Sequence, residues 1–296
     1  MPGMEINRKY LKVSGPIIIL FIGLSCTFNP FFKDENIEAV KISGQIGLAD
    51  NVSPEGVYVW LEGFNISETT DMDGNFSMTL PSPEAQGLGS DFSGKLAIFF
   101  YLANYGIDST IILFANGRLL KDQSSIDNNG HIIDKTILNN LVNIETLIEP
   151  EIIDFKENNT FHITIILKAF QETVSVGSLR ELLPPGSGFV RTGLIIEPFD
   201  NPNANTIFID RPESFLWNDV LFANTEQTWV LNISVNPDAF TRGGYRVIPY
   251  ILVRQDGIPE SLINSISSHI NEFCADYLQL PMKRIDGSFE VQAVGK

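Results

Sequence analysis

A strand, a tight acidic turn and a second strand follow one another between residues 68 and 80, and this unit constrains the fold more than any other feature of the sequence. The turn is Asp71-Met72-Asp73-Gly74, where Gly74 can adopt the positive φ angle that a tight turn requires. The residues from Phe76 to Leu80 then alternate between apolar and polar, which is the pattern of a half-buried strand. We therefore expect the residues around this unit to form further strands.

The two aspartates of the turn also suggest calcium, because oxygen ligands at alternate positions suit that ion. An EF-hand loop that began at Asp71 would need glycine at its sixth position and a bidentate glutamate at its twelfth. The sequence has Phe76 and Ser82 at these positions. We therefore interpret Asp71, Asp73 and Gly74 as a structural turn whose aspartates bond neighbouring backbone N–H groups, and we expect no metal there.

Further strands are predicted on both sides of this turn. Alternation predicts strands at Ala39–Leu48 and Gly56–Gly63, and apolar runs predict others at Lys95–Leu102 and Thr110–Ala115. The dipeptide Asn116-Gly117, a strong turn signal, closes the last of them. Residues 37–120 are thus predicted to form an all-β domain.

Three segments of this domain resemble the carboxypeptidase regulatory-like domain, which is a transthyretin-like seven-stranded β-sandwich. They are Ile42-Ser43-Gly44-Gln45-Ile46, Gly56-Val57-Tyr58-Val59-Trp60-Leu61 and Thr70-Asp71-Met72-Asp73-Gly74-Asn75-Phe76-Ser77-Met78. The resemblance covers about 80 residues. It departs from the family pattern in the long loop Pro81–Gly94 and in the loss of an obvious last strand after Leu120. The resemblance implies a non-catalytic module for binding, spacing or folding support.

A second all-β domain is predicted for residues 145–256. Alternating segments include Thr160–Leu167 and Thr228–Val235, and Gly244–Val253 is similar to the closing strands of bacterial Ig-like sandwiches. Residues 121–144 are predicted to connect the two domains. For residues 131–147 the apolar spacing is partly helical while the β-branched content favours a strand, so both assignments stay open.

One amphipathic helix is predicted at Pro259–Leu278, within a C-terminal segment of residues 257–296. Apolar residues follow the three-and-four spacing of one helix face, and Pro259 suits the first turn. Cys274 lies on this apolar stripe, so we expect a buried free thiol there.

The N-terminus has the features of an export signal. Basic residues precede an apolar core at Val13–Leu24 that is short for a transmembrane helix, and Gly23-Leu24-Ser25 precedes Cys26. This order resembles a bacterial lipobox, although Gly23 stands where leucine is usual. The resemblance implies a signal peptide at residues 1–25, acylation of Cys26, a tether at residues 26–36 and a membrane anchor. The alternative is an uncleaved N-terminal anchor with an incidental cysteine.

Charge and motifs narrow the function. A net charge of −16 makes nucleic acid a poor partner. The chain has only three histidines and contains no nucleophile elbow, zinc-binding His-Glu-x-x-His, P-loop or dinucleotide fingerprint. We therefore expect a protein that is not an enzyme and has no cofactor, exported to a bacterial cell envelope and held at the outer membrane or cell surface.

Two binding functions remain open. The first is an accessory or structural lipoprotein that contacts other envelope proteins. The second is a carbohydrate-binding protein in which Tyr58, Trp60, Trp217 and Trp229 stack on sugars. Trp60 alternates with the inward residues of its strand, so it should face out or toward the second domain. The carbohydrate function requires Tyr58 and Trp60 to form an open platform.

Overall fold

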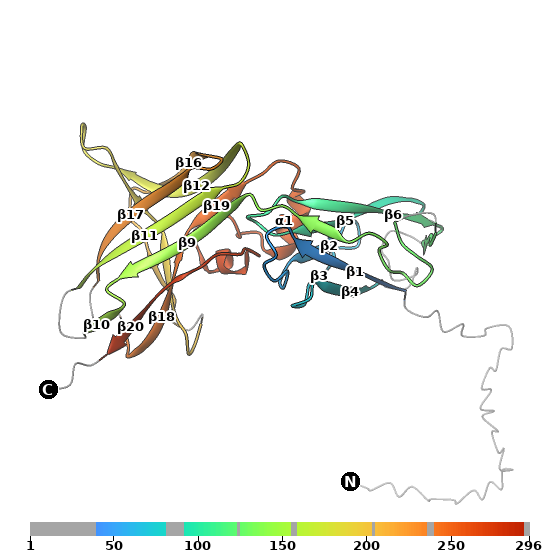
Figure 1. Ribbon diagram of the computed structural model, residues 1–296, viewed down its shortest axis with the longest axis horizontal. Helices are drawn as coiled ribbons and strands as arrows, with labels where there is room; N and C mark the ends of the chain where they lie inside the picture. The colour runs from blue at the N-terminus through green and yellow to red at the C-terminus, as the bar shows by residue number, and fades with distance from the viewer. Residues whose placement is uncertain are drawn as a thin grey trace, which may run out of the picture. The chain divides into compact units, whose positions relative to one another are not determined.

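A computed structural model describes residues 40–80, 92–122, 125–154, 159–202, 205–235 and 240–292. Within them the chain is all-β, as the sequence predicts: strands form several sheets, and one short α-helix lies near the C-terminal end (Figure 1). Cys26, the predicted signal peptide and the tether lie outside these residues. None of the described helices is long and apolar enough to cross a membrane.

The first half of the described chain is a sandwich of two sheets. Their strand orders are β4-β1-β8 and β3-β2-β5-β6-β7. The strands are β1 (Lys41–Leu48), β2 (Tyr58–Leu61), β3 (Ile66–Thr69), β4 (Asn75–Thr79), β5 (Gly94–Tyr101), β6 (Asp108–Ala115), β7 (Arg118–Leu119) and β8 (Thr136–Leu138). Alternate side chains point between the sheets, and Ile42, Ile46, Ile98 and Phe100 are at most 1% exposed.

Residues 121–144 are more than the connection that the sequence predicts. Strand β8 pairs in parallel with β1, with Ile46 opposite Thr136 and Leu48 opposite Leu138. The last strand of the first sandwich therefore comes from this region and not directly after Leu120. Strand β9 (Val142–Glu149) already belongs to the second half. The β-branched residues, rather than the helical spacing, decide the structure here.

The second half contains the remaining sheets, ordered β10-β20-β18-β14-β15, β17-β11-β9 and β13-β12-β16, with β19 also paired to β12. Its remaining strands are β10 (Ile152–Asp154), β11 (Asn159–Ala169), β12 (Thr173–Leu182), β13 (Phe189–Thr192), β14 (Leu194–Pro198), β15 (Ile207–Ile209), β16 (Phe215–Phe222), β17 (Glu226–Val235), β18 (Gly243–Pro249), β19 (Ile251–Arg254) and β20 (Gly287–Gln292). One cluster of buried aliphatic and aromatic side chains joins these sheets. This half is thus also a β-sandwich.

The predicted C-terminal helix is wrong in its length. Helix α1 covers only Glu260–Ile266, and a 3₁₀ helix, η3, covers Ala275–Gln279. The backbone is extended at Ser267 (φ −164°), whose hydroxyl bonds the Asp276 carboxylate and the backbone N–H of His269. Serine side chains that bond nearby backbone groups compete with helix formation. Helix α1 accordingly ends at Ser267.

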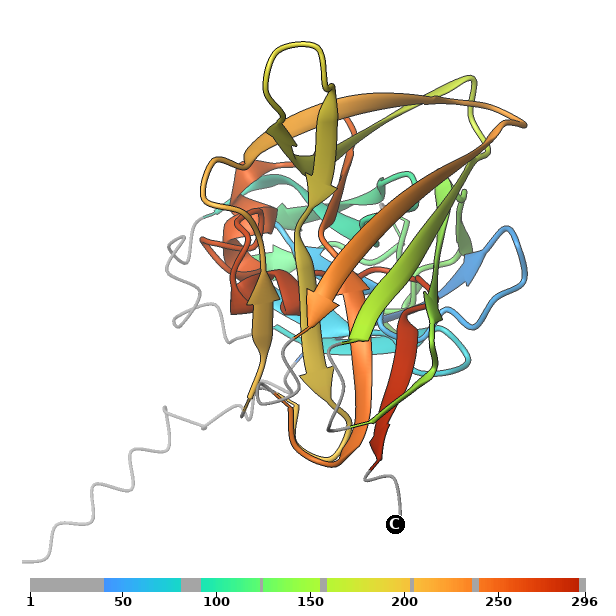
Figure 2. The ribbon, with the colours of Figure 1, turned by 90° about the vertical axis from the view of Figure 1, so that its left-hand side faces the viewer.

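Two further expectations for the C-terminal segment are corrected. Residues after the helix are not a tail, because β20 lies between β10 and β18 and pairs antiparallel with β18 (Figure 2). Cys274 is free but only partly buried, since the broken helix turns its thiol toward the backbone carbonyl of His269, with Sγ 3.6 Å from the oxygen.

Candidate functional site: a groove beside Tyr58

The outer face of sheet β3-β2-β5 carries aromatic side chains that the C-terminal segment covers. Because Val57, Val59 and Leu61 point into the first sandwich, the alternate residue Trp60 points outward. It packs in a separate cluster with Leu262 of α1 and Tyr277 of η3.

Trp60 therefore faces residues of the second half, but it offers no surface to a ligand. Its side chain is 2% exposed, and its indole N–H donates to the Asn65 carboxamide oxygen over 3.1 Å. The open platform of Tyr58 and Trp60 that sugar stacking requires is not formed. The indole instead packs between β2 and the C-terminal segment, where its large apolar surface is buried.

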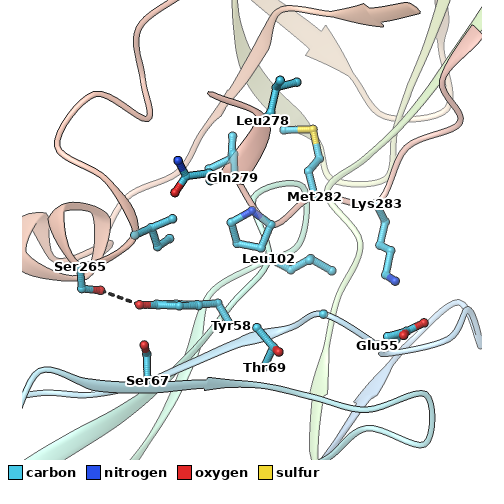
Figure 3. Close-up of a pocket in the computed structure, with 14 residues that line it drawn as sticks. Glu55, Tyr58, Ser67, Thr69, Leu102, Ser265, Leu278, Gln279, Met282 and Lys283 are labelled. Atoms are coloured by element: carbon cyan, nitrogen blue, oxygen red, sulfur yellow. Dashed lines mark hydrogen bonds between the residues drawn. The ribbon is translucent and has the colours of Figure 1, made fainter. Parts of the chain in front are cut away.

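A groove of about 560 Å³ opens beside this packed region. Ser67 and Thr69 of β3 stand opposite Trp60 and Tyr58 in the strand register, so they share the outer face. Their short side chains leave space below η3 and the residues after it. The groove is lined by Tyr58, Ser67 and Thr69 on one side and by Gln279, Met282 and Lys283 on the other (Figure 3).

A hydrogen bond links the two sides of the groove. Tyr58 Oη lies 3.0 Å from Ser265 Oγ (Figure 3). The Ser265 hydroxyl already donates to the Leu262 carbonyl over 2.6 Å, so Tyr58 is the donor and Ser265 the acceptor. This bond fixes the tyrosine ring as part of the groove wall.

The lining combines apolar and polar groups. Leu102, Leu278 and Met282 supply apolar surface, while the Gln279 carboxamide and the hydroxyls of Ser67 and Thr69 can exchange hydrogen bonds with a ligand. Glu55 and Lys283 place one charge of each sign at the same end of the groove (Figure 3). Such a lining suits an amphipathic ligand that has both apolar and hydrogen-bonding groups.

The aspartate turn is a separate, structural feature. Asp71 Oδ1 accepts hydrogen bonds from the backbone N–H of Asp73 (3.0 Å) and of Asn75 (2.8 Å). These bonds, the one from Asn75 first, lower the pKa of the Asp71 carboxyl. Gly74 takes φ +81° and packs directly against the Ile46 carbonyl. Across the described ranges no group of three or more His, Cys, Asp or Glu side chains could hold a metal ion.

One polar cluster joins the loop after β1 to the residues before β9. The Asp50 carboxylate accepts hydrogen bonds from Tyr105 Oη (2.6 Å) and Asn140 Nδ2 (2.9 Å). Burial raises the pKa of Asp50, but the hydrogen bonds outweigh it and the pKa is lowered. The three residues come from distant segments, so no local motif signals them. They clamp the loop after β1 to the chain that enters the second half.

The other two candidate stacking residues lie in the second half, apart from the groove. Trp217 of β16 is 49% exposed and Trp229 of β17 is 3% exposed. The guanidinium of Arg180 lies 5.5 Å from the Trp217 ring centre, and that of Arg191 lies 4.1 Å from the Trp229 ring centre. Both tryptophans thus already contact cations of the chain.

Comparisons with known proteins found distant structural neighbours. No protein-family model matches the chain, and no curated protein matches its sequence. Among solved structures, the sporulation control protein Spo0M of Bacillus subtilis is 11% identical with a TM-score of 0.27, and the match covers 52% of this chain and 50% of that one. The chain therefore matches only half the length of Spo0M.

Two further neighbours are equally distant. The Bacillus anthracis TIE protein is 8% identical with a TM-score of 0.22, over 74% of this chain and 48% of that one. The major pilin of Streptococcus pyogenes, solved as a point mutant, is 9% identical with a TM-score of 0.21, over 86% of this chain and 99% of that one. None of these similarities assigns a function to the chain.

Proposed function

We propose that this chain is a non-catalytic accessory protein of a bacterial cell envelope that binds a segment of a partner protein in the groove beside Tyr58. The observation that carries the proposal is the lining of the groove. Apolar side chains such as Met282 lie beside hydroxyl and amide groups, with Glu55 and Lys283 at one end. A peptide presents the same mixture of apolar side chains and backbone hydrogen-bonding groups.

Catalysis and sugar binding are less well supported by this groove. The described residues that line it include serine and threonine hydroxyls, but no histidine, the side chain that most often serves as their general base. Tyr58 is the only aromatic residue among them, and its hydroxyl is already bonded to Ser265. The net charge of −16 disfavours nucleic acid as the partner.

The proposal includes a lipid anchor on Cys26 and export to the cell envelope. Its support is the sequence before Cys26 and the resemblance of the first half to the carboxypeptidase regulatory-like domain, whose module is non-catalytic. An accessory protein held at a membrane would present its groove to neighbouring envelope proteins.

Site-specific cross-linking in cells tests the groove. A photo-activatable residue in place of Ser67 should give one discrete adduct with another protein. The matched control is the same residue in place of Glu68, which lies on β3 but does not line the groove. Gln279→Trp, which fills the groove, should reduce the adduct at least tenfold. Equal adducts at both positions, or none, would contradict the proposal.

Two further measurements separate the alternatives. A glycan array should show no ligand for the intact chain; a glycan whose binding is lost in Gln279→Trp would instead establish the carbohydrate function. Cells fed labelled palmitate should label the chain, and Cys26→Ala should abolish the label. Label that survives this substitution would refute the anchor without affecting the groove.

A further inference from the structure

Strand β16 is an edge strand with exposed apolar side chains. Among the described residues it pairs only with β12. Leu216 is 41%, Trp217 49%, Val220 48% and Phe222 56% exposed. Leu216 and Asn218 lie beside the bare backbone of Gly177 on the outer face, and Val220, two residues after Asn218, points to the same face. Edge strands are usually protected by charges, prolines or bulges, whereas the one charge of β16, on Asp219, is engaged by Arg180.

The backbone groups at the free edge of β16 can be identified from two hydrogen bonds. The N–H of Ala223 donates to the Glu172 carbonyl in the β12 direction, over 3.2 Å. The Val220 carbonyl accepts instead from the Gln227 side chain over 3.3 Å. Backbone groups alternate in direction along an antiparallel strand. Odd-numbered residues therefore bond β12, and Leu216, Asn218 and Val220 present their N–H and C=O groups at the free edge.

The sequence of β16, Phe-Leu-Trp-Asn-Asp-Val-Leu-Phe, carries apolar residues on both sides of its two central polar residues. Two antiparallel copies of one strand are related by a two-fold axis perpendicular to the sheet, which places each residue opposite one on the same face. With the axis at Asn218, Leu216 stands opposite Val220 of the second copy and Phe215 opposite Leu221. The apolar side chains of these two pairs meet each other, whereas Trp217 stands opposite Asp219 of the second copy.

The neighbouring registers are less favourable. An axis at Asp219 would place two carboxylates directly opposite each other, and like charges in that position destabilise a sheet. An axis at Trp217 would place Leu216 opposite Asn218 and Phe215 opposite Asp219. The register centred on Asn218 uses the free backbone groups, avoids the opposed carboxylates and pairs Leu216 with Val220 on the outer face.

We propose that two copies of this chain associate through β16, antiparallel and centred on Asn218, to form one continuous sheet with the order β13-β12-β16-β16-β12-β13. The interaction buries Leu216 and Val220 of both copies, and it pairs the N–H and C=O groups of the edge, where the Val220 carbonyl also accepts from Gln227. It is independent of the groove beside Tyr58.

Disulfide cross-linking tests the register. All variants are made in the full chain with Cys274→Ser and are studied in detergent solution. This parent still carries Cys26, so any cross-link that it forms is the background to subtract. Asn218→Cys should give a disulfide-linked dimer on mild oxidation, because hydrogen-bonded partners lie about 5.5 Å apart between Cα atoms, within the range for a disulfide. The matched control Val230→Cys, 58% exposed on β17, should give none.

A second pair of sites makes the register test sharper. Leu216→Cys and Val220→Cys should each fail to cross-link alone, because each meets the other residue of the second copy. The double variant should cross-link efficiently. Cross-linking by either single variant at the level of Asn218→Cys would overturn the register.

Sedimentation tests the association itself without introduced cysteines. The full chain should sediment as a dimer, and Val220→Lys should weaken association at least tenfold while far-UV circular dichroism stays unchanged. Val230→Lys, the control, should remain dimeric. A parent chain that stays monomeric, or a Val220→Lys variant that associates as well as the parent, would overturn the proposal.

Discussion

Asn104 and Lys283 lie 179 positions apart in the sequence and are joined by two hydrogen bonds. The Asn104 carboxamide donates to the Lys283 carbonyl over 2.7 Å and accepts from the Lys283 N–H over 2.9 Å. It also donates to the Val142 carbonyl over 3.0 Å, while Asn104 itself is 1% exposed. One side chain thus joins the end of β5, the start of β9 and the residue at the charged end of the groove.

Asn104→Leu should destabilise the fold. It would leave the partly buried backbone N–H of Lys283 without its partner, and each fully buried group of this kind costs about 1–3 kcal/mol. We expect a loss of about 2–4 kcal/mol in the free energy of unfolding, because more than one group loses its partner. Denaturation in urea measures this loss. Asn139→Ala, at an exposed neighbouring asparagine, is the control, and an equal loss in both variants would contradict the role of Asn104.

Two glycines with the same backbone angle should respond differently to alanine. Gly56 takes φ +80° in open space, whereas Gly74 takes φ +81° with its Cβ position only 2.0 Å from the Ile46 carbonyl oxygen. Gly56→Ala should cost about 1–2 kcal/mol from the left-handed backbone alone. Gly74→Ala should cost more, because β1 or the turn must also move. Thermal unfolding of the two variants checks the order, and an equal loss would show that the contact relaxes freely.

The strands of the first half could be predicted because their signal is local. Alternation around Ile42, Val59 and Phe76 depends on neighbouring residues and a two-residue period. The turn at Gly74 could be predicted for the same reason. Each of these features is specified within about ten residues of sequence.

The candidate site could not be predicted, because it forms from distant segments. Ser67 and Gln279 line one groove, and neither lies in a motif. The alternation correctly places Trp60 on the outer face, but only the packing of Tyr277 above it shows that this face is core. Helix α1 ends early at Ser267 because that hydroxyl bonds Asp276, a partner that apolar spacing does not reveal.

The imidazole of His269 should have a pKa above its ordinary value. Its Nδ1 lies 3.0 Å from Glu272 Oε1, and this hydrogen bond, with the attraction of the carboxylate, raises the pKa of the imidazole. Because the pKa is raised, the His269–Glu272 pair stabilises the folded state fully below the ordinary value of about 6.5. This stabilisation is lost as pH rises through the pKa of the folded state. Both side chains are exposed, so the effect on stability should be small.

Nuclear magnetic resonance titration of His269 measures this shift directly. Glu272→Gln should move the pKa of His269 back toward its ordinary value. The measurement should be repeated at high salt, where screening weakens the attraction of an exposed carboxylate. A pKa of His269 that is insensitive to Glu272→Gln would show that the pair does not form in solution.

Trp60 and Tyr58 are adjacent on one face of β2. Substitution of Trp60 should mainly reduce folding stability, and substitution of Tyr58 should mainly reduce binding in the groove. Trp60→Ala removes a 2% exposed indole and should cost about 3–5 kcal/mol of folding stability, as for other large-to-small core substitutions. Tyr58→Phe removes only the hydroxyl that bonds Ser265 and should cost about 0.5–1.5 kcal/mol. Urea denaturation measures both losses.

Cross-linking from Ser67 should show the opposite order in folded protein: Tyr58→Phe should reduce it more than Trp60→Ala. At a temperature where both variants are folded, Tyr58→Phe should reduce cross-linking from Ser67, because the unbonded ring and α1 no longer hold the groove wall in place. Folded Trp60→Ala should retain more of that cross-linking, since the indole lies outside the groove lining. Trp217→Ala, at a 49% exposed ring distant from the groove, should leave the cross-linking unchanged. A loss confined to Trp60→Ala would contradict the assignment of Trp60 to the core and of Tyr58 to the site.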